Sequence, residues 1–180
     1  MKILPTSIPG VLLLEPRVFS DDRGFFFESY SEKMCAELGI KEHFVQDNQS
    51  FSHRNVLRGL HYQIEHPQGK LVRVAMGEIL DVAVDLRRSS PTFGKWEAAR
   101  LSGENKLMFW IPPGFAHGFS VLSDSAHVLY KTSDVYFPAG ERTILWNDPD
   151  LNIEWQLKGE PIISAKDEAG TPFRQAEIFD

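Results

Sequence analysis

Cysteine is almost absent from this chain of 180 residues, in which Cys35 is the only one. A single thiol excludes an intrachain disulfide and fits a reducing compartment. Long hydrophobic runs are missing too. The N-terminal segment is interrupted by Pro5 and Pro9, and it has no run long enough for a signal peptide or a membrane span. We therefore expect a cytoplasmic protein with no membrane partner.

Positive charge is also scarce, with 19 Lys and Arg against 25 Asp and Glu and a net charge of −6. This balance argues against a nucleic-acid partner, which normally selects a basic stripe. It allows an anionic small molecule, because a local cluster of Arg and Lys can make a positive pocket in an acidic protein. No linker, repeat or low-complexity tract divides the chain, so its length predicts a single domain over residues 1–180.

Short strand-like runs separated by turn residues make up most of the sequence. They are Val11–Phe19, Gly24–Tyr30, Phe44–Phe51, Val56–Gln63, Lys70–Met76, Glu78–Leu86, Lys95–Leu101, Lys106–Ile111, His117–Leu122, His127–Tyr136 and Arg142–Trp146. One helix is expected at Ser31–Leu38, with Ser31 as its N-cap and Gly39 at its end. Many short strands and few helices predict an antiparallel sandwich or barrel.

In the run Ile79–Leu86, the apolar residues Leu80, Val82, Val84 and Leu86 share one face, while Asp81 and Asp85 share the other. Two carboxylates on one strand face are most often solvated. In a barrel with a polar interior they could instead line a site and orient basic side chains. The sequence leaves both interpretations open.

The chemistry is concentrated in RGLHYQ at residues 58–63 and QGK at residues 68–70. These runs place Arg58, His61 and Lys70 within thirteen residues. A histidine can take a proton near neutral pH, while Arg and Lys can hold phosphate and a developing oxyanion. A second imidazole, His117, follows the tight turn of PPGFAH. Although a lone histidine on a strand is usually structural, this set predicts proton transfer on an anionic small molecule.

Strict alternation along the strand puts Arg58 and His61 on opposite faces. Gly59 lies between them and can supply a β-bulge that re-aims one of the two side chains. Without a bulge, only one of them can face the site.

Several motifs in the same order, RGLHYQ…QGKLVRV, DVAVDLR..SPTFG.W, WIPPGFAHGF and WNDP, resemble the dTDP-4-dehydrorhamnose 3,5-epimerase family from about Pro9 to about Asp167. The resemblance implies an all-β, cupin-like antiparallel sandwich or jelly-roll barrel with a few short helices. It implies an isomerase that inverts C3 and C5 of dTDP-4-dehydro-6-deoxy-D-glucose to give dTDP-4-dehydro-L-rhamnose. It also implies a homodimer, and we expect the apolar segment Val11–Leu14 to be a sheet edge that needs cover.

The resemblance also assigns roles to residues of this sequence. His61 is the base that removes protons beside the C4 ketone, and Asp167 fixes its tautomer. Lys70 stabilises charge near O4, and Tyr130 donates a proton to the opposite ring face. The implied binding residues are Arg23 and Arg58 for the diphosphate, Glu28, Gln46, Asp47 and Asn48 for the thymidine portion, and His117, Glu141 and Lys166 as further contacts to the substrate.

Many cupins bind a metal through two histidines separated by one residue, a later glutamate and a histidine in the position of His117. The paired histidines are absent here, because His61 is followed by Tyr62 and Gln63. We therefore predict no metal site and no cofactor. Three alternatives remain open: an epimerase acting at C3 or C5 only on a related dTDP-4-keto-deoxysugar, a metal-dependent cupin enzyme, and a sugar-binding cupin without catalysis. Retention of His61, Lys70 and Tyr130 together favours the double epimerase.

Overall fold

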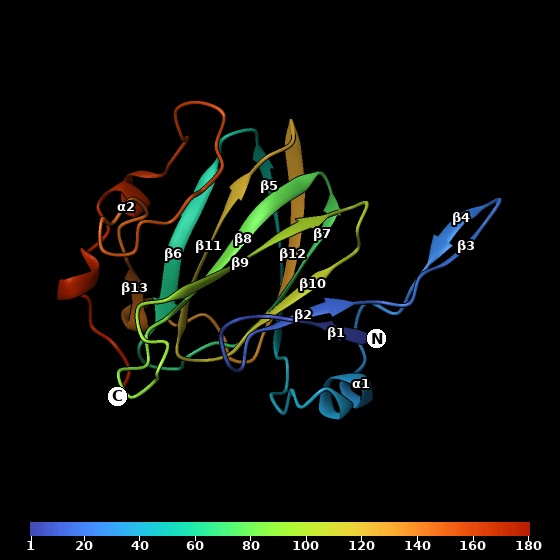
Figure 1. The fold of residues 1–180 in the computed structure, drawn as a ribbon, viewed down its shortest axis with the longest axis horizontal. Helices are drawn as coiled ribbons and strands as arrows, with labels where there is room; N and C mark the ends of the chain where they lie inside the picture. Colours follow the sequence, from blue (N-terminus) through green and yellow to red (C-terminus); the bar gives the residue numbers. More distant parts are fainter.

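Two antiparallel β-sheets face each other in the computed structural model, which describes residues 1–180 (Figure 1). The six-stranded sheet has the order β1 (Lys2–Leu4), β2 (Leu12–Glu15), β10 (Met108–Ile111), β7 (Lys70–Met76), β12 (Ser125–Thr132) and β5 (Gln46–His53). The five-stranded sheet has the order β13 (Glu141–Thr143), β6 (Leu57–Gln63), β11 (Phe115–Val121), β8 (Glu78–Asp85) and β9 (Trp96–Ser102). A separate hairpin pairs β3 (Phe19–Asp21) with β4 (Gly24–Phe26). This arrangement confirms the predicted antiparallel sandwich.

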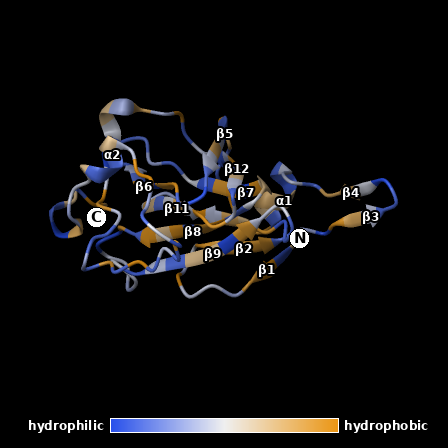
Figure 2. Cartoon of the chain, turned by 90° about the horizontal axis from the view of Figure 1, so that it is seen from above, coloured by the Kyte–Doolittle hydropathy of each residue, from blue (hydrophilic) through white to orange (hydrophobic).

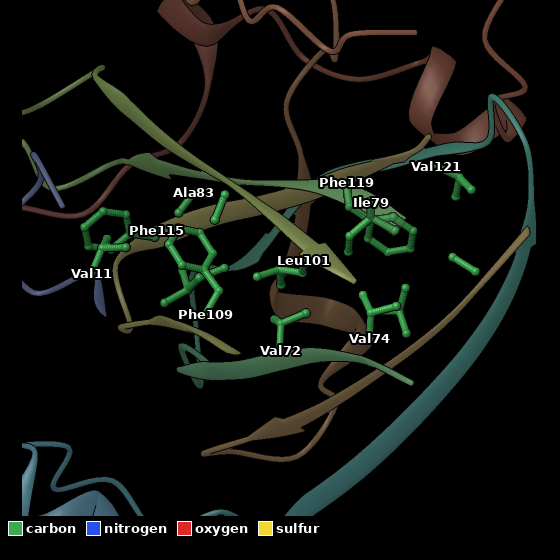
Figure 3. Close-up of a cluster of buried hydrophobic side chains, with 14 of the residues drawn as sticks. Val11, Val72, Val74, Ile79, Ala83, Leu101, Phe109, Phe115, Phe119 and Val121 are labelled. Atoms are coloured by element: carbon green, nitrogen blue, oxygen red, sulfur yellow. The ribbon is translucent and has the colours of Figure 1, made fainter. Parts of the chain in front are cut away.

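The main core lies between the two sheets (Figure 3). Its buried side chains include Val72, Val74, Phe109 and Ile111 from the six-stranded sheet and Ile79, Phe115, Phe119 and Val121 from the five-stranded sheet. Strands such as β2 and β8 are largely hydrophobic, whereas β5 is mainly hydrophilic (Figure 2). Since each fully buried large apolar side chain contributes about 1.5–3 kcal/mol, this layer is the main source of stability.

The helix α1 (Glu32–Glu37) covers part of the outer face of the six-stranded sheet. Ser31 caps it by accepting a hydrogen bond from the backbone N–H of Met34, and Gly39 follows with a φ of +85°. These features confirm the predicted helix and its two ends. Cys35 is buried against Leu14 in this cluster.

The C-terminal part of the chain covers the outer face of the five-stranded sheet. It carries the short helix α2 (Ala165–Glu168) and the 3₁₀ turns η1 (Pro138–Gly140) and η2 (Phe173–Gln175). The sequence analysis did not predict α2, because four residues are too few for a helical period. None of the helices has the length and apolar character that crossing a membrane requires.

Several predicted strand bounds were too long. The run Val11–Phe19 is divided by Pro16, which ends β2. Gly24–Tyr30 stops at Phe26, and His127–Tyr136 stops at Thr132. The expectation that Val11–Leu14 forms a sheet edge was wrong, because β2 pairs with β1 on one side and β10 on the other.

The structure decides the open question about Asp81 and Asp85. Both side chains are completely buried, so the solvated interpretation was wrong. Asp81 accepts a hydrogen bond from His117, and Asp85 accepts several from the turn that follows β8, including two from Arg87. Since the apolar face of β8 packs under the C-terminal segment, its acidic face looks into the sandwich.

Candidate active site

A cavity of about 270 Å³ opens between the two sheets. Most of its lining is polar or aromatic, and both sheets contribute to it. Strands contribute Gln46 and Asn48 (β5), His61, Tyr62 and Gln63 (β6), Lys70 (β7), Tyr130 (β12) and Glu141 (β13). The loops contribute Gln68 and Tyr136. The cavity therefore brings together three of the four residues predicted to be catalytic.

Asp167, the fourth of these residues, is hydrogen-bonded to His61. Nε2 of His61 lies 2.6 Å from Oδ1 of Asp167, a contact between residues 106 positions apart in the chain. Burial alone would raise the pKa of Asp167, but hydrogen bonds from His61, the Gly59 N–H and Ser164 outweigh that effect and lower it. An ionised carboxylate only accepts hydrogen bonds. Nε2 of His61 therefore carries a hydrogen, and in the neutral imidazole the free lone pair is the one on Nδ1.

A β-bulge in β6 sets the direction of Arg58. His117 of β11 lies opposite His61, and Phe119 lies opposite Arg58, so β6 has one more residue than β11 over this stretch. The sequence analysis required a bulge at Gly59 for Arg58 and His61 to face the same site. Nε of Arg58 donates to Ser52 on β5 at 3.0 Å. Arg58 thus lies beside the cavity rather than in its wall.

Only glycine fits the bulge at residue 59. Its φ is +119°, a conformation that side chains with a Cβ rarely adopt. A Cβ there would lie 2.5 Å from Cα of Gly118 and 2.7 Å from the carbonyl oxygen of His117. The close approach of β6 to β11 therefore depends on this glycine.

Lys70 is almost completely buried at the start of β7. Burial lowers its pKa to about 8, although the negative charges of Asp81 and Glu141 act in the opposite direction. The one hydrogen bond of its ammonium goes to the carbonyl oxygen of His61 at 3.4 Å. Two of its three N–H groups are left for other partners.

Tyr130 lines the cavity from β12, in the sheet opposite His61. Burial raises the pKa of its phenol, with a smaller opposing effect from the charge of Arg58. The phenol therefore keeps its proton at neutral pH and can act as an acid.

His117 does not line the cavity, although its Cα is paired with that of His61. It is buried behind the wall, and its Nε2 lies 2.8 Å from Oδ1 of Asp81. Burial lowers the pKa of His117 despite this partner. His117 is therefore a neutral imidazole in the interior, not an exposed phosphate ligand.

Glu141 lies at the edge of the cavity and joins two other elements. Its Oε2 accepts a hydrogen bond from the hydroxyl of Tyr136 at 2.7 Å and lies 2.6 Å from Nζ of Lys166. Lys166 precedes Asp167 in α2, so this ion pair ties the helix that carries Asp167 to the cavity edge. The hydrogen bonds of Glu141 with Lys166 and Tyr136 lower its pKa against the effect of burial.

The three thymidine residues predicted on β5 divide between two faces. Gln46 and Asn48 line the cavity and are hydrogen-bonded to each other at 2.9 Å. Asp47 points to the opposite face, where it pairs with Lys131 at 3.0 Å. Period-two alternation along β5 explains this separation.

Arg23 and Glu28 lie away from the cavity. Arg23 is at the exposed tip of the β3–β4 hairpin, which projects from the sandwich, and pairs with Asp21 at 2.6 Å (Figure 1). Glu28 follows the same hairpin and lines a different hollow with Phe19 and Phe26. Within one chain, the structure does not bring these two predicted contacts to the site.

Four lining residues were missed by the sequence analysis: Tyr62, Gln63, Gln68 and Tyr136. The two glutamines lie within the motifs around His61 and Lys70, which was a usable signal. Gln63 accepts from the backbone N–H of Phe137, and Gln68 donates to the carbonyl of Asp134, so they hold the loop after β12. Tyr136 comes from that loop and left no signal in the sequence.

The structure contains no group of three or more His, Cys, Asp and Glu side chains placed to hold a metal ion. The two histidines nearest the cavity, His61 and His117, each direct Nε2 at a carboxylate. The absence of a metal cofactor stays a prediction.

The fold is a cupin-like β-sandwich, and its cavity brings together a carboxylate-held imidazole, a buried ammonium and a buried phenol, a set typical of an enzyme that moves protons. The comparisons with known proteins make this class specific. A family model described as dTDP-4-dehydrorhamnose 3,5-epimerase matches residues 5–175, and the chain belongs to this family. It is an epimerase of the 3,5 type, and thus an isomerase.

The similarity to known proteins extends over nearly the whole chain. The dTDP-4-dehydrorhamnose 3,5-epimerase of Pseudomonas aeruginosa is 59% identical over an alignment of 180 positions, which covers 99% of each chain. A crystal structure of the Legionella pneumophila enzyme, in complex with dTDP-4-keto-L-rhamnose, is 50% identical with a TM-score of 0.96, covering 98% of this chain and 94% of that one. A 3'-monoepimerase from Streptomyces bikiniensis, in complex with dTDP-quinovose, is 36% identical with a TM-score of 0.87, covering 94% and 87%.

Proposed function

We propose that the chain converts dTDP-4-dehydro-6-deoxy-D-glucose into dTDP-4-dehydro-L-rhamnose by inverting C3 and C5. The observation that carries this proposal is the contact of 2.6 Å between His61 and Asp167 at a cavity that Lys70 and Tyr130 also line. C3 and C5 both flank the C4 ketone, so one base and one site for the enolate serve both carbons.

His61 starts each inversion. Its Nδ1 takes the proton from the carbon beside the ketone, and the electron pair of that C–H bond moves to form the enolate, with negative charge on O4. Asp167 keeps Nε2 protonated and stabilises the imidazolium that forms. General base catalysis of this kind contributes about 10²–10⁴-fold.

Lys70 stabilises the enolate. Its ammonium has N–H groups without partners and is shielded from water, so it interacts more strongly with the anionic O4 than with the neutral ketone. An interaction that strengthens as charge develops lowers the barrier rather than only binding the substrate.

Tyr130 completes the inversion from the opposite face of the ring. Its phenol gives a proton to the carbon as the enolate returns to the ketone, and water then reprotonates the phenolate. A second group is required, because a base that returned its own proton would restore the starting configuration. The raised pKa of Tyr130 keeps the donor protonated between turnovers.

The nucleotide part of the substrate would bind at the mouth of the cavity. Gln46 and Asn48 present amides to the thymine, while Arg58 and Lys166 supply positive charge for the diphosphate, a task that suits the forked guanidinium. Lys166 would exchange Glu141 for a phosphate oxygen.

Incubation of the substrate in D₂O, followed by NMR, tests this function. We expect deuterium at both C3 and C5, because His61 and Tyr130 exchange their protons with solvent. His61→Ala should lose nearly all turnover and exchange while still binding dTDP, since the base does not hold the nucleotide. The absence of exchange at either carbon would contradict proton abstraction.

The same measurement decides between double and single inversion. Deuterium and inversion at one carbon only would make the chain a mono-epimerase. The similarity to the 3'-monoepimerase of Streptomyces bikiniensis is the reason to test this alternative. Metal analysis of the purified protein tests the other alternative. Stoichiometric iron, manganese or zinc would favour a metal-dependent cupin enzyme.

The chain would act as a homodimer in the cytoplasm. Arg23 was predicted to contact the diphosphate, yet its hairpin projects from the sandwich (Figure 1), and Arg23 does not line the cavity of its own chain. The hairpin also exposes the apolar side chains of Phe19, Phe25 and Phe26. Both facts are explained if the hairpin of one protomer packs on the other and carries Arg23 and Glu28 to the partner's cavity.

A further inference from the structure

Asp81 is the one buried carboxylate near the cavity that is only half satisfied. Its side chain is fully buried on β8. Oδ1 accepts a hydrogen bond from His117, but Oδ2 is buried without any hydrogen-bond partner. A buried carboxylate oxygen without a partner is costly unless a positive charge lies close by.

Lys70 is the matching feature on the facing sheet. Its ammonium is nearly as buried, and its one hydrogen bond is the long contact to the carbonyl of His61. Asp81 exerts the largest electrostatic effect of any charged group on Lys70, ahead of Glu141. An incompletely paired cation and an incompletely paired anion therefore share one interior region.

Other titratable groups face this region from the elements around it. They are His61 and Arg58 from β6, His117 from β11, Tyr130 from β12, Glu141 from β13, and Lys166 and Asp167 from α2. Asp167 is committed to His61, and Glu141 is committed to Lys166 and Tyr136. Of these carboxylates, only Asp81 has a buried oxygen without a hydrogen-bond partner.

We propose that Asp81 is the internal counter-ion of Lys70 and keeps its ammonium charged for the reaction. His117, neutral in the interior, fixes the carboxylate through Oδ1 and leaves Oδ2 for the electrostatic contact. Asp81 touches no reacting atom, so it is a positioning residue that acts through Lys70. The proposal rests on the role given to Lys70 above and extends it. The carboxylate of Asp81 stabilises the charge of the buried ammonium without forming an ion pair with it, so the N–H groups of Lys70 stay free for the substrate.

The pH dependence of kcat/KM tests the proposal. With Lys70 titrating at about 8, activity should fall on the alkaline side as the ammonium loses its proton. Asp81→Asn keeps the shape and the hydrogen bond from His117 but removes the charge. The pH at the midpoint of its alkaline limb should fall by about one unit. The variant should then have about fivefold less activity than wild type at pH 8 and nearly the same activity at pH 6.

Asp85→Asn is the matched control. It makes the same chemical change on the same face of the same strand, but Asp85 is bound to Arg87, Ser90 and Thr92 and not to the cavity. Its alkaline limb should stay at the wild-type position. A profile for Asp81→Asn that falls equally at every pH, or a shift in both variants, would overturn the proposal.

A measurement on the free enzyme separates this proposal from the proposed reaction. Lysine ¹⁵N NMR follows the titration of Nζ directly, and the Lys70 signal is assigned by its loss in Lys70→Met. Asp81→Asn should move that titration to lower pH whether or not the chain acts on the expected sugar. An unchanged titration sinks the counter-ion role even if turnover is impaired.

Failure of Asp81→Asn to fold is informative as well. The variant would leave Lys70 as a buried cation without its counter-ion, so Lys70→Met in the same chain should restore folding and raise the denaturation midpoint above that of Asp81→Asn. If the double variant is no more stable than Asp81→Asn, the two side chains are not coupled and the proposal fails.

Discussion

His61 and His117 lie opposite each other on neighbouring strands, yet their surroundings give them different chemistry. The side chain of His61 is 30% exposed and rests on an ionised carboxylate at the cavity wall. His117 is buried, and burial lowers its pKa. An imidazole that lines a cavity and is held in one tautomer can act as a base, whereas the buried His117 does not open onto the cavity.

Tyr130→Phe tests the acid at the scale of one atom. The change keeps the packed ring and deletes the hydroxyl, so folding should be nearly unaffected. His61 would still form the enolate, but no donor would stand on the far face. We expect solvent exchange at C3 or C5 to persist, while net inversion falls by about 10²-fold or more.

NMR in D₂O measures exchange and inversion in the same sample. If the two fall together, Tyr130 acts on enolate formation or substrate placement instead. If inversion continues at the normal rate, another group is the donor.

At the scale of elements, the site depends on irregularities in otherwise regular strands. The bulge in β6 leaves His61 in the cavity wall and Arg58 beside the cavity, although period-two alternation would separate their side chains. The short helix α2 holds Asp167 beneath His61, and Ser164 caps that helix by accepting from the N–H of Asp167. Regular strands build the scaffold, and the bulge and the cap set the geometry of the base.

Gly59→Ala and Gly24→Ala form a matched pair that tests the bulge. Both glycines have strongly positive φ, but a Cβ at Gly24 meets nothing within 4 Å. Gly24→Ala should cost about 1–2 kcal/mol for the backbone conformation alone. Gly59→Ala should cost at least about 2 kcal/mol more, because its Cβ would overlap the backbone of β11.

Urea denaturation measures both free energies of unfolding, and turnover should fall in Gly59→Ala, because the bulge positions His61. Equal destabilisation of the two variants would mean that β6 and β11 move apart without penalty.

The connection between β8 and β9 gives a prediction about acid stability. Burial would raise the pKa of Asp85, but hydrogen bonds from Arg87, Ser90 and Thr92 outweigh burial and lower it to about 2. A depressed pKa means that the unfolded chain binds the proton more readily, so the stabilisation is present above pH ~4 and is lost as pH falls through ~2. Its size is about 2 kcal/mol.

Denaturation of wild type and Asp85→Asn over this pH range measures the effect. The difference between them should be constant near neutrality and shrink toward pH 2. Asp22→Asn, on the exposed hairpin, controls for net charge. A difference between wild type and Asp85→Asn that does not depend on pH would show that the carboxylate is not stabilised in this way.

At the scale of the whole molecule, the projecting hairpin is the feature that a single chain does not explain. If Arg23 acts in the partner's cavity, a mixed dimer of His61→Ala and Arg23→Ala protomers contains one intact site. That site takes His61 from one protomer and Arg23 from the other. Its second site carries both defects.

Mixing the two variants after reversible dissociation should therefore restore activity at about a quarter of all sites, since random pairing makes half of the dimers mixed. The assay is turnover at low substrate concentration, where the Arg23 contact matters most. The control mixes His61→Ala with Tyr130→Phe, whose two residues line the same cavity of one chain. Its mixed dimers should gain nothing, and equal recovery in both mixtures would rule out an exchanged hairpin.

Much of the architecture was predictable from the sequence. Period-two runs gave the strands of both sheets, and Ser31 and Gly39 marked the ends of α1. The motifs around His61, Lys70 and His117 indicated acid–base chemistry and the family. These features depend on neighbours within about ten residues, so they are visible without the fold.

Only the tertiary structure decided where those residues lie. It buried Asp81 and Asp85, which local alternation left open, and it turned Asp47 away from the amides beside it. It brought Asp167, which the family resemblance alone had paired with His61, into contact with that residue across 106 positions, and it placed Arg23 outside the cavity of its own chain. The physical reason is that propensity and periodicity act along the chain, whereas burial, charge pairing and the reach of a side chain depend on how two sheets pack.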